Sequence, residues 1–193
     1  MVDTVRTTAS LLSSLFQDGQ AANEITANDM RDLIVSLRPS FGECSMQGNA
    51  TATTIAGAGT YYKIAGTTAL SGNELLFDNN STNTGRLRYI GAPNRVVLFS
   101  ASISLSAASN NQVLSLKGWH YDDSGASGSL VDASLVSRKV TASGELGAVV
   151  VQGSALMSVN DYIEIHVTNE TSTAAVTVED FNVIFHFDFF LQA

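Results

Sequence analysis

The chain has few of the residues that mark several common protein classes. Its only cysteine is Cys44, so no disulfide can form within the chain. Two prolines are too few for a collagen-like or proline-rich protein. No window approaches the roughly 20 apolar residues of a membrane-spanning helix, and the start of the chain lacks the apolar core of a signal peptide. We therefore expect a soluble protein made in the cytoplasm.

Charge is also scarce. Charged residues make up 15% of the 193 residues, against roughly 25% in an average domain. The formal net charge is −8, and the 10 basic residues are scattered, with the densest group in "GRLR" at 85–88. Nucleic-acid binding requires clustered Lys and Arg, so that class is excluded. Ser, Thr and Asn replace the missing charges, which favours either surfaces covered by partners or the exposed surface of a particle.

No catalytic or cofactor-binding motif is present. "GASGS" at 125–129 fails the last position of a nucleophile elbow. "GAG" at 57–59 lacks the third glycine and the following helix of a dinucleotide loop. H-E-x-x-H and paired-cysteine zinc patterns are missing as well. We predict a protein that is not an enzyme and holds no cofactor.

Residues 1–42 form a predicted helical arm. A short helix is expected at 8–16, and a second one follows Thr26, a plausible N-cap with Asp29 three residues on. Pro39 ends this helix. "QDGQ" resembles part of a calcium-binding loop, but Phe16 occupies a ligand position, so we reject that interpretation. The second helix carries one apolar stripe, too small to be buried by the arm alone, which predicts docking on the β region or on a partner: Met30, Leu33, Ile34 and Leu37.

Residues 43–193 alternate apolar and polar side chains with a period of two. Three strands are clear, at 95–107, 161–167 and 178–190, and polar turn clusters separate them from weaker ones. The weaker strands are expected at 60–65, 74–78, 85–91, 112–121, 134–142 and 145–153. This pattern predicts a mainly β protein, an antiparallel jelly-roll β-sandwich following the short helical arm.

The closing strand at 178–190 has apolar residues on both faces. A strand of this kind suits a contact between subunits, although burial inside a monomer explains it too. The residues predicted for the subunit interface are Phe181, Ile184, Phe185, Phe187 and Phe190.

Three segments of the β region resemble C1q/TNF-like domains. They are "RYIGAPNRVVLFSASISLSAAS" (88–109), "ALMSVNDYIEIHV" (155–167) and "VTVEDFNVIFHF" (176–187). The turn Asn160-Asp161-Tyr162 has Asn where that family usually has Gly. The resemblance implies a trimeric jelly roll whose closing strand runs through the core and against neighbouring subunits.

The N-terminal region resembles a more specific class. "EITANDMRDLIVSLRPSFGE", followed by a Thr/Gly/Ala-rich stretch and "YYKIAGTT", is similar to the start of small structural proteins of tailed bacteriophages. The resemblance implies a virion component with other capsid or tail proteins as partners. A homotrimeric capsid decoration protein, either cement or head fibre, is favoured because no shaft separates arm and β-domain. The alternative is a tail-fibre or tail-tip protein that binds a host receptor or surface glycan.

Two ligand hypotheses remain open. His166 or His186 would meet its symmetry mates if it lay on a three-fold axis, where a metal ion could bind, but a hydrogen-bonded or exposed histidine is the simpler interpretation. Trp119 and Tyr121, beside "DDSGASGS", could form a sugar-binding loop. A single Trp in such a place is more often part of a core or rim.

Overall fold

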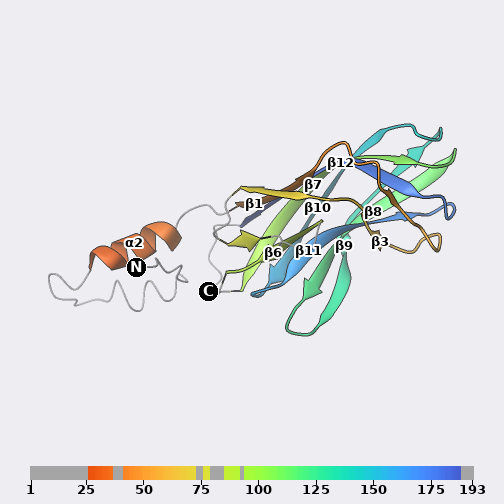
Figure 1. Cartoon of the computed structure of the whole chain (residues 1–193). Coiled ribbons are helices and arrows are strands. Elements are labelled where there is room, and N and C mark those ends of the chain that lie inside the picture. The colour runs from red at the N-terminus through yellow and green to blue at the C-terminus, as the bar shows by residue number, and fades with distance from the viewer. Residues whose placement is uncertain (1–25, 37–40, 73–75, 79–84, 92–93, 188–193) are drawn as a thin grey trace.

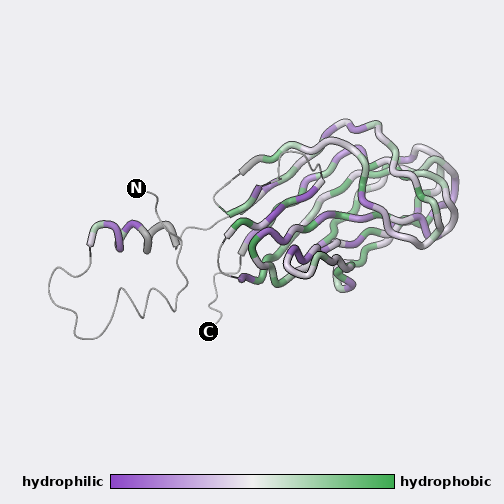
Figure 2. Tube along the Cα trace, turned by 60° about the horizontal axis from the view of Figure 1, so that its bottom comes forward, coloured by the Kyte–Doolittle hydropathy of each residue, from purple (hydrophilic) through white to green (hydrophobic). Residues whose placement is uncertain are grey.

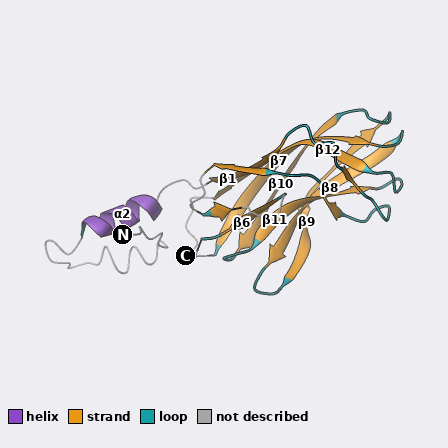
Figure 3. Cartoon of the chain, in the orientation of Figure 1, coloured by secondary structure: helices purple, strands orange, loops and turns teal. Residues whose placement is uncertain are grey.

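The computed structural model describes residues 26–36, 41–72, 76–78, 85–91 and 94–187. Figure 1 shows two β-sheets packed into a sandwich, with one described helix lying apart from them. Figure 3 separates this helix, in purple, from the strands, in orange. The mainly β fold class is confirmed. The predicted helix at 8–16 lies outside the described residues.

Helix α2 (Ala27–Ser36) begins with the predicted cap. The Asp29 N–H donates to Thr26 Oγ1 at 3.2 Å, and the Thr26 N–H donates to Asp29 Oδ2 at 2.8 Å. These reciprocal bonds form a capping box with an aspartate in the place of glutamate. Met30, the first residue of the predicted stripe, is 44% exposed. The side chains of Leu33 and Ile34, and the whole of Leu37, lie outside the described part.

Sheet A has six antiparallel strands in the order β10-β7-β12-β1-β4, with β2 paired to β12. Sheet B also has six, in the order β5-β6-β11-β8-β9, with β3 paired to β11. Sheet A contains β1 (Phe41–Met46), β2 (Ala52–Thr53), β4 (Ala69–Gly72), β7 (Arg95–Ala107), β10 (Gly147–Met157) and β12 (Val176–Phe187). Sheet B contains β3 (Tyr62–Lys63), β5 (Phe77–Asp78), β6 (Arg86–Tyr89), β8 (Gln112–Asp122), β9 (Ser127–Val140) and β11 (Tyr162–Asn169).

Strands distant in sequence pair across both sheets, as a jelly roll requires. β12 lies between β7 and β1, and β11 lies between β6 and β8. On one side the sheets meet where β9 approaches β10, and Arg138 Nη1 donates to the Ala148 carbonyl at 3.3 Å. β1 begins at Phe41, two residues inside the segment assigned to the arm. β1, β2 and β4 were not predicted.

Alternation along the strands builds the core between the sheets, and the tube in Figure 2 changes repeatedly between hydrophobic and hydrophilic along the sandwich. Phe99 of β7 packs at the centre. A Cβ on Gly118 or Gly153 would lie 2.5 or 2.6 Å from its ring, so both facing positions require glycine. Phe185 meets Phe77 edge-on, with ring centroids 5.6 Å apart.

The structure corrects the role predicted for two residues of the closing strand. Phe181 and Phe185 are 2% and 0% exposed within a single chain, so they have almost no surface left for a neighbouring subunit. Their alternating position on β12 turns them toward sheet B, which explains their burial. The side chain of Phe187 and the whole of Phe190 lie outside the described part. Of the predicted interface set, Ile184 lies on the surface, with 38% exposure.

Candidate subunit interface and the opposite polar face

The outer face of sheet A consists of the side chains that point away from the core on β10, β7, β12 and β1. Its centre is the serine row of β7, which includes Ser100, Ser102 and Ser104. The register places Ile184 beside Ser100 and Val150 beside Ser102. Small, neutral side chains therefore form a flat strip between strands that carry aliphatic ones.

Large apolar side chains on this face are exposed to solvent. Val150 and Leu156 of β10 are 51% and 54% exposed, and Phe41 of β1 is 45% exposed. Of the exposed apolar side chains on this face, Val150 and Ile184 lie on either side of the serine row. Apolar surface gathered on one face, rather than scattered singly, is typical of a protein interaction site.

The same face contains a hollow of about 610 Å³. Two of the residues that line it are hydrogen-bonded to each other, since Asn182 Nδ2 donates to Glu43 Oε1 at 2.8 Å. The other amide atom, Asn182 Oδ1, is buried and has no hydrogen-bond partner among the described residues. A buried acceptor of this kind is rare in folded proteins unless water or a neighbouring molecule satisfies it. The lining includes Glu43, Ser45, Gln47, Ser102, Ser104, Ala148, Val150, Asp180 and Asn182.

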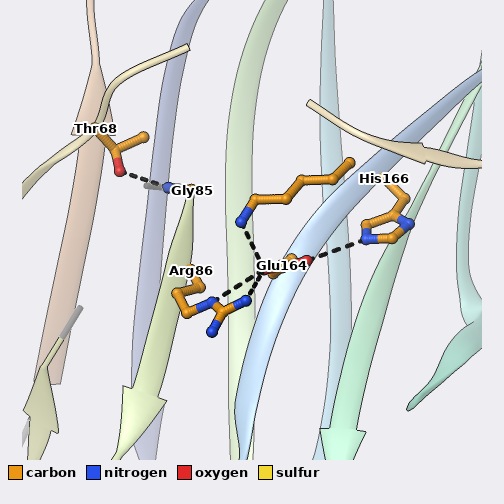
Figure 4. A network of polar contacts seen from close by, with 6 residues as sticks. Thr68, Gly85, Arg86, Glu164 and His166 are labelled. Atoms are coloured by element: carbon orange, nitrogen blue, oxygen red, sulfur yellow. Dashed lines mark hydrogen bonds and ion pairs between the residues drawn. The ribbon is translucent and has the colours of Figure 1, made fainter. Parts of the chain in front are cut away.

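The outer face of sheet B has a different character, because a buried ion cluster occupies it. Glu164 of β11 is only 5% exposed. Its Oε1 accepts hydrogen bonds from Lys63 Nζ at 2.7 Å and from Arg86 Nη2 at 2.9 Å. His166 Nε2 lies 3.3 Å from Oε2 (Figure 4). Beside this cluster the Gly85 N–H donates to Thr68 Oγ1, which ties the start of β6 to the loop before β4.

Charge outweighs burial at this carboxyl group. Burial alone would raise the pKa of Glu164, but the hydrogen bond from His166 and the hydrogen bond and charge of Lys63 lower it, with a further contribution from Arg86. The pKa falls from 4.5 to about 2. Glu164 therefore stays ionised at any physiological pH and acts as a permanent counter-charge for two cations.

Aromatic rings next to the cluster are stacked on partners from the same chain. The Tyr121 and Tyr162 rings are parallel, with centroids 4.6 Å apart, and the Arg86 guanidinium lies 3.8 Å from the Tyr162 ring centroid. Trp119 stacks on His166 at 4.8 Å. The predicted sugar-binding aromatics thus use ring faces for internal packing, which leaves less surface for stacking on a sugar.

The turn between β10 and β11 depends on Asp161. Asn160 adopts a φ of 72°, the left-handed conformation that glycine usually provides. The Asp161 carboxylate, 2% exposed, accepts hydrogen bonds from the N–H groups of Ser158 and Asp123. His120 Nε2 lies 3.3 Å from it. Asp161 thus fastens this turn to the hairpin between β8 and β9, a structural role that sequence reasoning missed.

The two histidines considered for a metal site, His166 and His186, lie on opposite faces of the sandwich. His166 is 9% exposed and belongs to the Glu164 cluster, whereas His186 is exposed on the outer face of sheet A. Among the described residues, no group of three or more His, Cys, Asp and Glu could hold a metal ion. None of the helices in the described ranges has the length and apolar character needed to cross a bilayer.

Comparison with known proteins identifies the fold. No family model and no curated protein matches the sequence. Murine APRIL at pH 5.0 is similar in structure, with a TM-score of 0.52 and 7% identity, over 78% of this chain and 100% of that one. Eiger TNF from S. frugiperda gives a TM-score of 0.51 and 9% identity, over 81% and 100%. At such identities the likeness concerns the fold, which is a TNF-like jelly roll.

Proposed function

We propose that this protein is a non-enzymatic homotrimeric structural component of a phage particle, a capsid decoration protein whose subunits meet through the outer face of sheet A. The observation that carries the trimer is the set of exposed apolar side chains on this face: Phe41, Val150, Leu156 and Ile184. Two further features of this face support the trimer. A neighbouring chain would fill the hollow and would donate a hydrogen bond to the buried Asn182 Oδ1.

The phage assignment rests on the N-terminal sequence resemblance, and it makes the virion the place where the protein acts. α2 lies apart from the sandwich, and Met30 is exposed on it. A helix with an uncovered apolar residue suits an arm that docks on another virion protein. The polar clusters of the β-domain have structural roles, because Glu164 links three strands and Asp161 stabilises a turn. This use of the charged residues favours binding over catalysis.

Light scattering tests the trimer. The wild-type chain is expected at about three times its mass of 20.4 kDa. Ile184→Asp should yield folded monomers, since a charge on a desolvated contact has no partner. Val159→Asp is the matched control, because Val159 is also exposed, at 47%, but lies in the turn after β10. A monomeric wild type, or a trimeric Ile184→Asp chain, would refute the proposed interface.

A competition assay on particles that lack the protein tests the arm. Leu33→Asp puts a charge in the centre of the predicted stripe and is expected to abolish docking. Thr26→Ala removes only the cap and should weaken docking modestly. Deleting residues 1–39 should likewise abolish incorporation but leave a folded β-domain. Normal docking by the Leu33→Asp chain would mean that attachment uses another surface.

A further inference from the structure

The cluster around Glu164 has more positive than negative charge. Lys63 and Arg86 both bind Oε1 of this single carboxylate. Counting Lys63, Arg86 and Glu164, the cluster carries one net positive charge, in a chain whose formal net charge is −8. Two further cations on the outer face of sheet B have carboxylates of their own, since Arg88 pairs with Asp78 and Lys117 pairs with Asp132.

The two cations are held in place and still reach solvent. The Glu164 carboxylate accepts hydrogen bonds from both cationic groups and so fixes their positions. The Arg86 guanidinium also packs over the Tyr162 ring, 3.8 Å from its centroid. The Lys63 side chain is 32% exposed and that of Arg86 is 17% exposed. The contacts to Glu164 use Nε and Nη2 of Arg86 and do not involve Nη1. An anion arriving from solvent thus meets donors whose orientation is already set, which reduces the entropy lost on binding.

We propose that Lys63 and Arg86 bind the carboxylate of an acidic carbohydrate, a uronic-acid type of sugar. The half-buried Tyr162 lies against Arg86, and the half-buried Tyr121 stacks on Tyr162, so their hydroxyls can exchange hydrogen bonds with sugar hydroxyls. The site lies on the sheet opposite to the proposed subunit contact and does not depend on it.

A peptide ligand fits this surface less well. Peptides are usually anchored by large apolar or aromatic side chains in pockets. The exposed large apolar side chains of the described residues lie elsewhere, on the arm, on sheet A and on β9 or loops: Met30, Phe41, Leu135, Leu146, Val150, Leu156, Val159 and Ile184. Stacking of a neutral sugar is also disfavoured, because Tyr162 lies between Tyr121 and Arg86. Charge recognition remains as the main source of affinity.

Fluorescence of the full chain provides the binding assay. Trp119 is the only tryptophan, and it stacks on His166, which contacts Glu164. Trigalacturonate is expected to change this emission saturably, with an affinity that falls as salt is added. Maltotriose, a neutral oligosaccharide, should bind at least about tenfold more weakly, since it lacks the charge-assisted hydrogen bond, which is worth roughly that factor. A glutamate tripeptide keeps the carboxylate but lacks the sugar hydroxyls, so it should bind more weakly than trigalacturonate through the loss of the neutral hydrogen bonds.

A matched pair of variants locates the site. Lys63→Met keeps the aliphatic stem but removes the charge, and trigalacturonate should bind about tenfold more weakly. Lys139→Met makes the same charge change at an exposed position of β9 and should bind as wild type does. NMR titration of the wild type provides a test that needs no variant, because shifts should concentrate on Lys63, Arg86 and their neighbours. Four results would each overturn the proposal. Trigalacturonate could give no saturable change in emission, maltotriose or the glutamate tripeptide could bind as tightly as trigalacturonate does, Lys139→Met could weaken binding as much as Lys63→Met, or the NMR shifts could be centred away from Lys63 and Arg86.

Discussion

The outer faces of the two sheets satisfy their side chains in different ways. On sheet B, charged groups find partners within the chain, as Glu164 does with Lys63 and Arg86. On sheet A, serines separate exposed aliphatic side chains, and the buried Asn182 Oδ1 has no partner in the part of the chain that the structure describes. Buried polar atoms without a partner among the described residues do not separate the two faces, because His166 Nδ1 and Thr168 Oγ1 of sheet B are also of this kind. The faces differ in paired charge, which is concentrated on sheet B, and in the exposed aliphatic side chains of sheet A. The difference shows that the same alternating pattern can produce two functionally distinct surfaces.

The largest effect is expected where β12 faces the core. Phe185→Ala should cost about 3–5 kcal/mol of stability, because it opens a cavity beside Phe77 and Phe99. Its neighbour Ile184 faces outward, so Ile184→Ala should cost less than about 1 kcal/mol within one chain. Urea denaturation at several chain concentrations separates the two, because a loss at Ile184 that acts through assembly must shrink on dilution. A small loss at Phe185 would contradict the core position.

A second pair of variants compares carboxylates on the two faces. Glu164→Gln leaves Lys63 and Arg86 without their counter-charge and should cost about 3 kcal/mol, at the low end for a broken buried pair because both cations still reach water. Glu43→Gln on sheet A weakens one hydrogen bond from Asn182 and should cost about 1 kcal/mol or less. Thermal or urea unfolding of both chains measures the difference. Equal losses would mean that the Glu164 cluster is not specially stabilising.

Acid should weaken the sheet B face through the same residue. The folded pKa of Glu164, about 2, lies below its ordinary value of 4.5, so its contribution is complete above pH 4.5 and is lost as the pH falls toward 2. By linkage, about 2 kcal/mol should be lost by pH 3. Subtracting the pH profile of Glu164→Gln from that of the wild type isolates this contribution. Profiles that run parallel between pH 5 and pH 3 would rule it out.

The smallest effect on stability is expected in the arm, because both residues of its helix cap lie within the arm itself. Thr26→Ala removes the acceptor for the Asp29 N–H and should cost about 0.5–2 kcal/mol of helix stability. Thr26→Ser keeps the oxygen and serves as the control. Amide hydrogen exchange at Asp29 and Met30 in the full chain reports the change. Unaltered protection in Thr26→Ala would show that the capping box does not hold the helix start.

Sequence patterns predicted best those elements whose alternation or cap is complete within one continuous segment of the chain. β7 has the predicted bounds, 95–107, because a run of apolar residues leads into a regular alternation of apolar residues and serines from Phe99 to Ala107. The Thr26 cap was also predicted, since both of its partners lie within one helical turn. β1 was missed because "FGECSM" buries Cys44 and Met46 but has Gly at the remaining inward position. That glycine, Gly42, is required by Phe77, since a Cβ would lie 2.7 Å from the Phe77 Cβ.

The sites were harder to predict than the strands because their members are distant in sequence. Lys63 lies 101 residues and Arg86 78 residues from Glu164, so nothing local indicates that they meet. The closing strand showed that both of its faces are apolar, but not which face turns inward. This ambiguity explains why Phe181 and Phe185 were assigned to a subunit contact along with Ile184. Only the register of β12 against β7 and β1 resolves it.

The position of β12 has a consequence for how the protein is made. β12 is the last strand of the described residues, yet it pairs with β1 on one side and β7 on the other. Until the ribosome has released it, the two halves of sheet A have no common strand to join them, and the inward faces of β7 and β1 remain without their central neighbour. Long-range pairing of this kind slows folding and leaves strand edges open in the meantime. Sheet A can therefore be completed only once β12 has left the ribosome, and the strands made earlier keep open edges that favour aggregation until then.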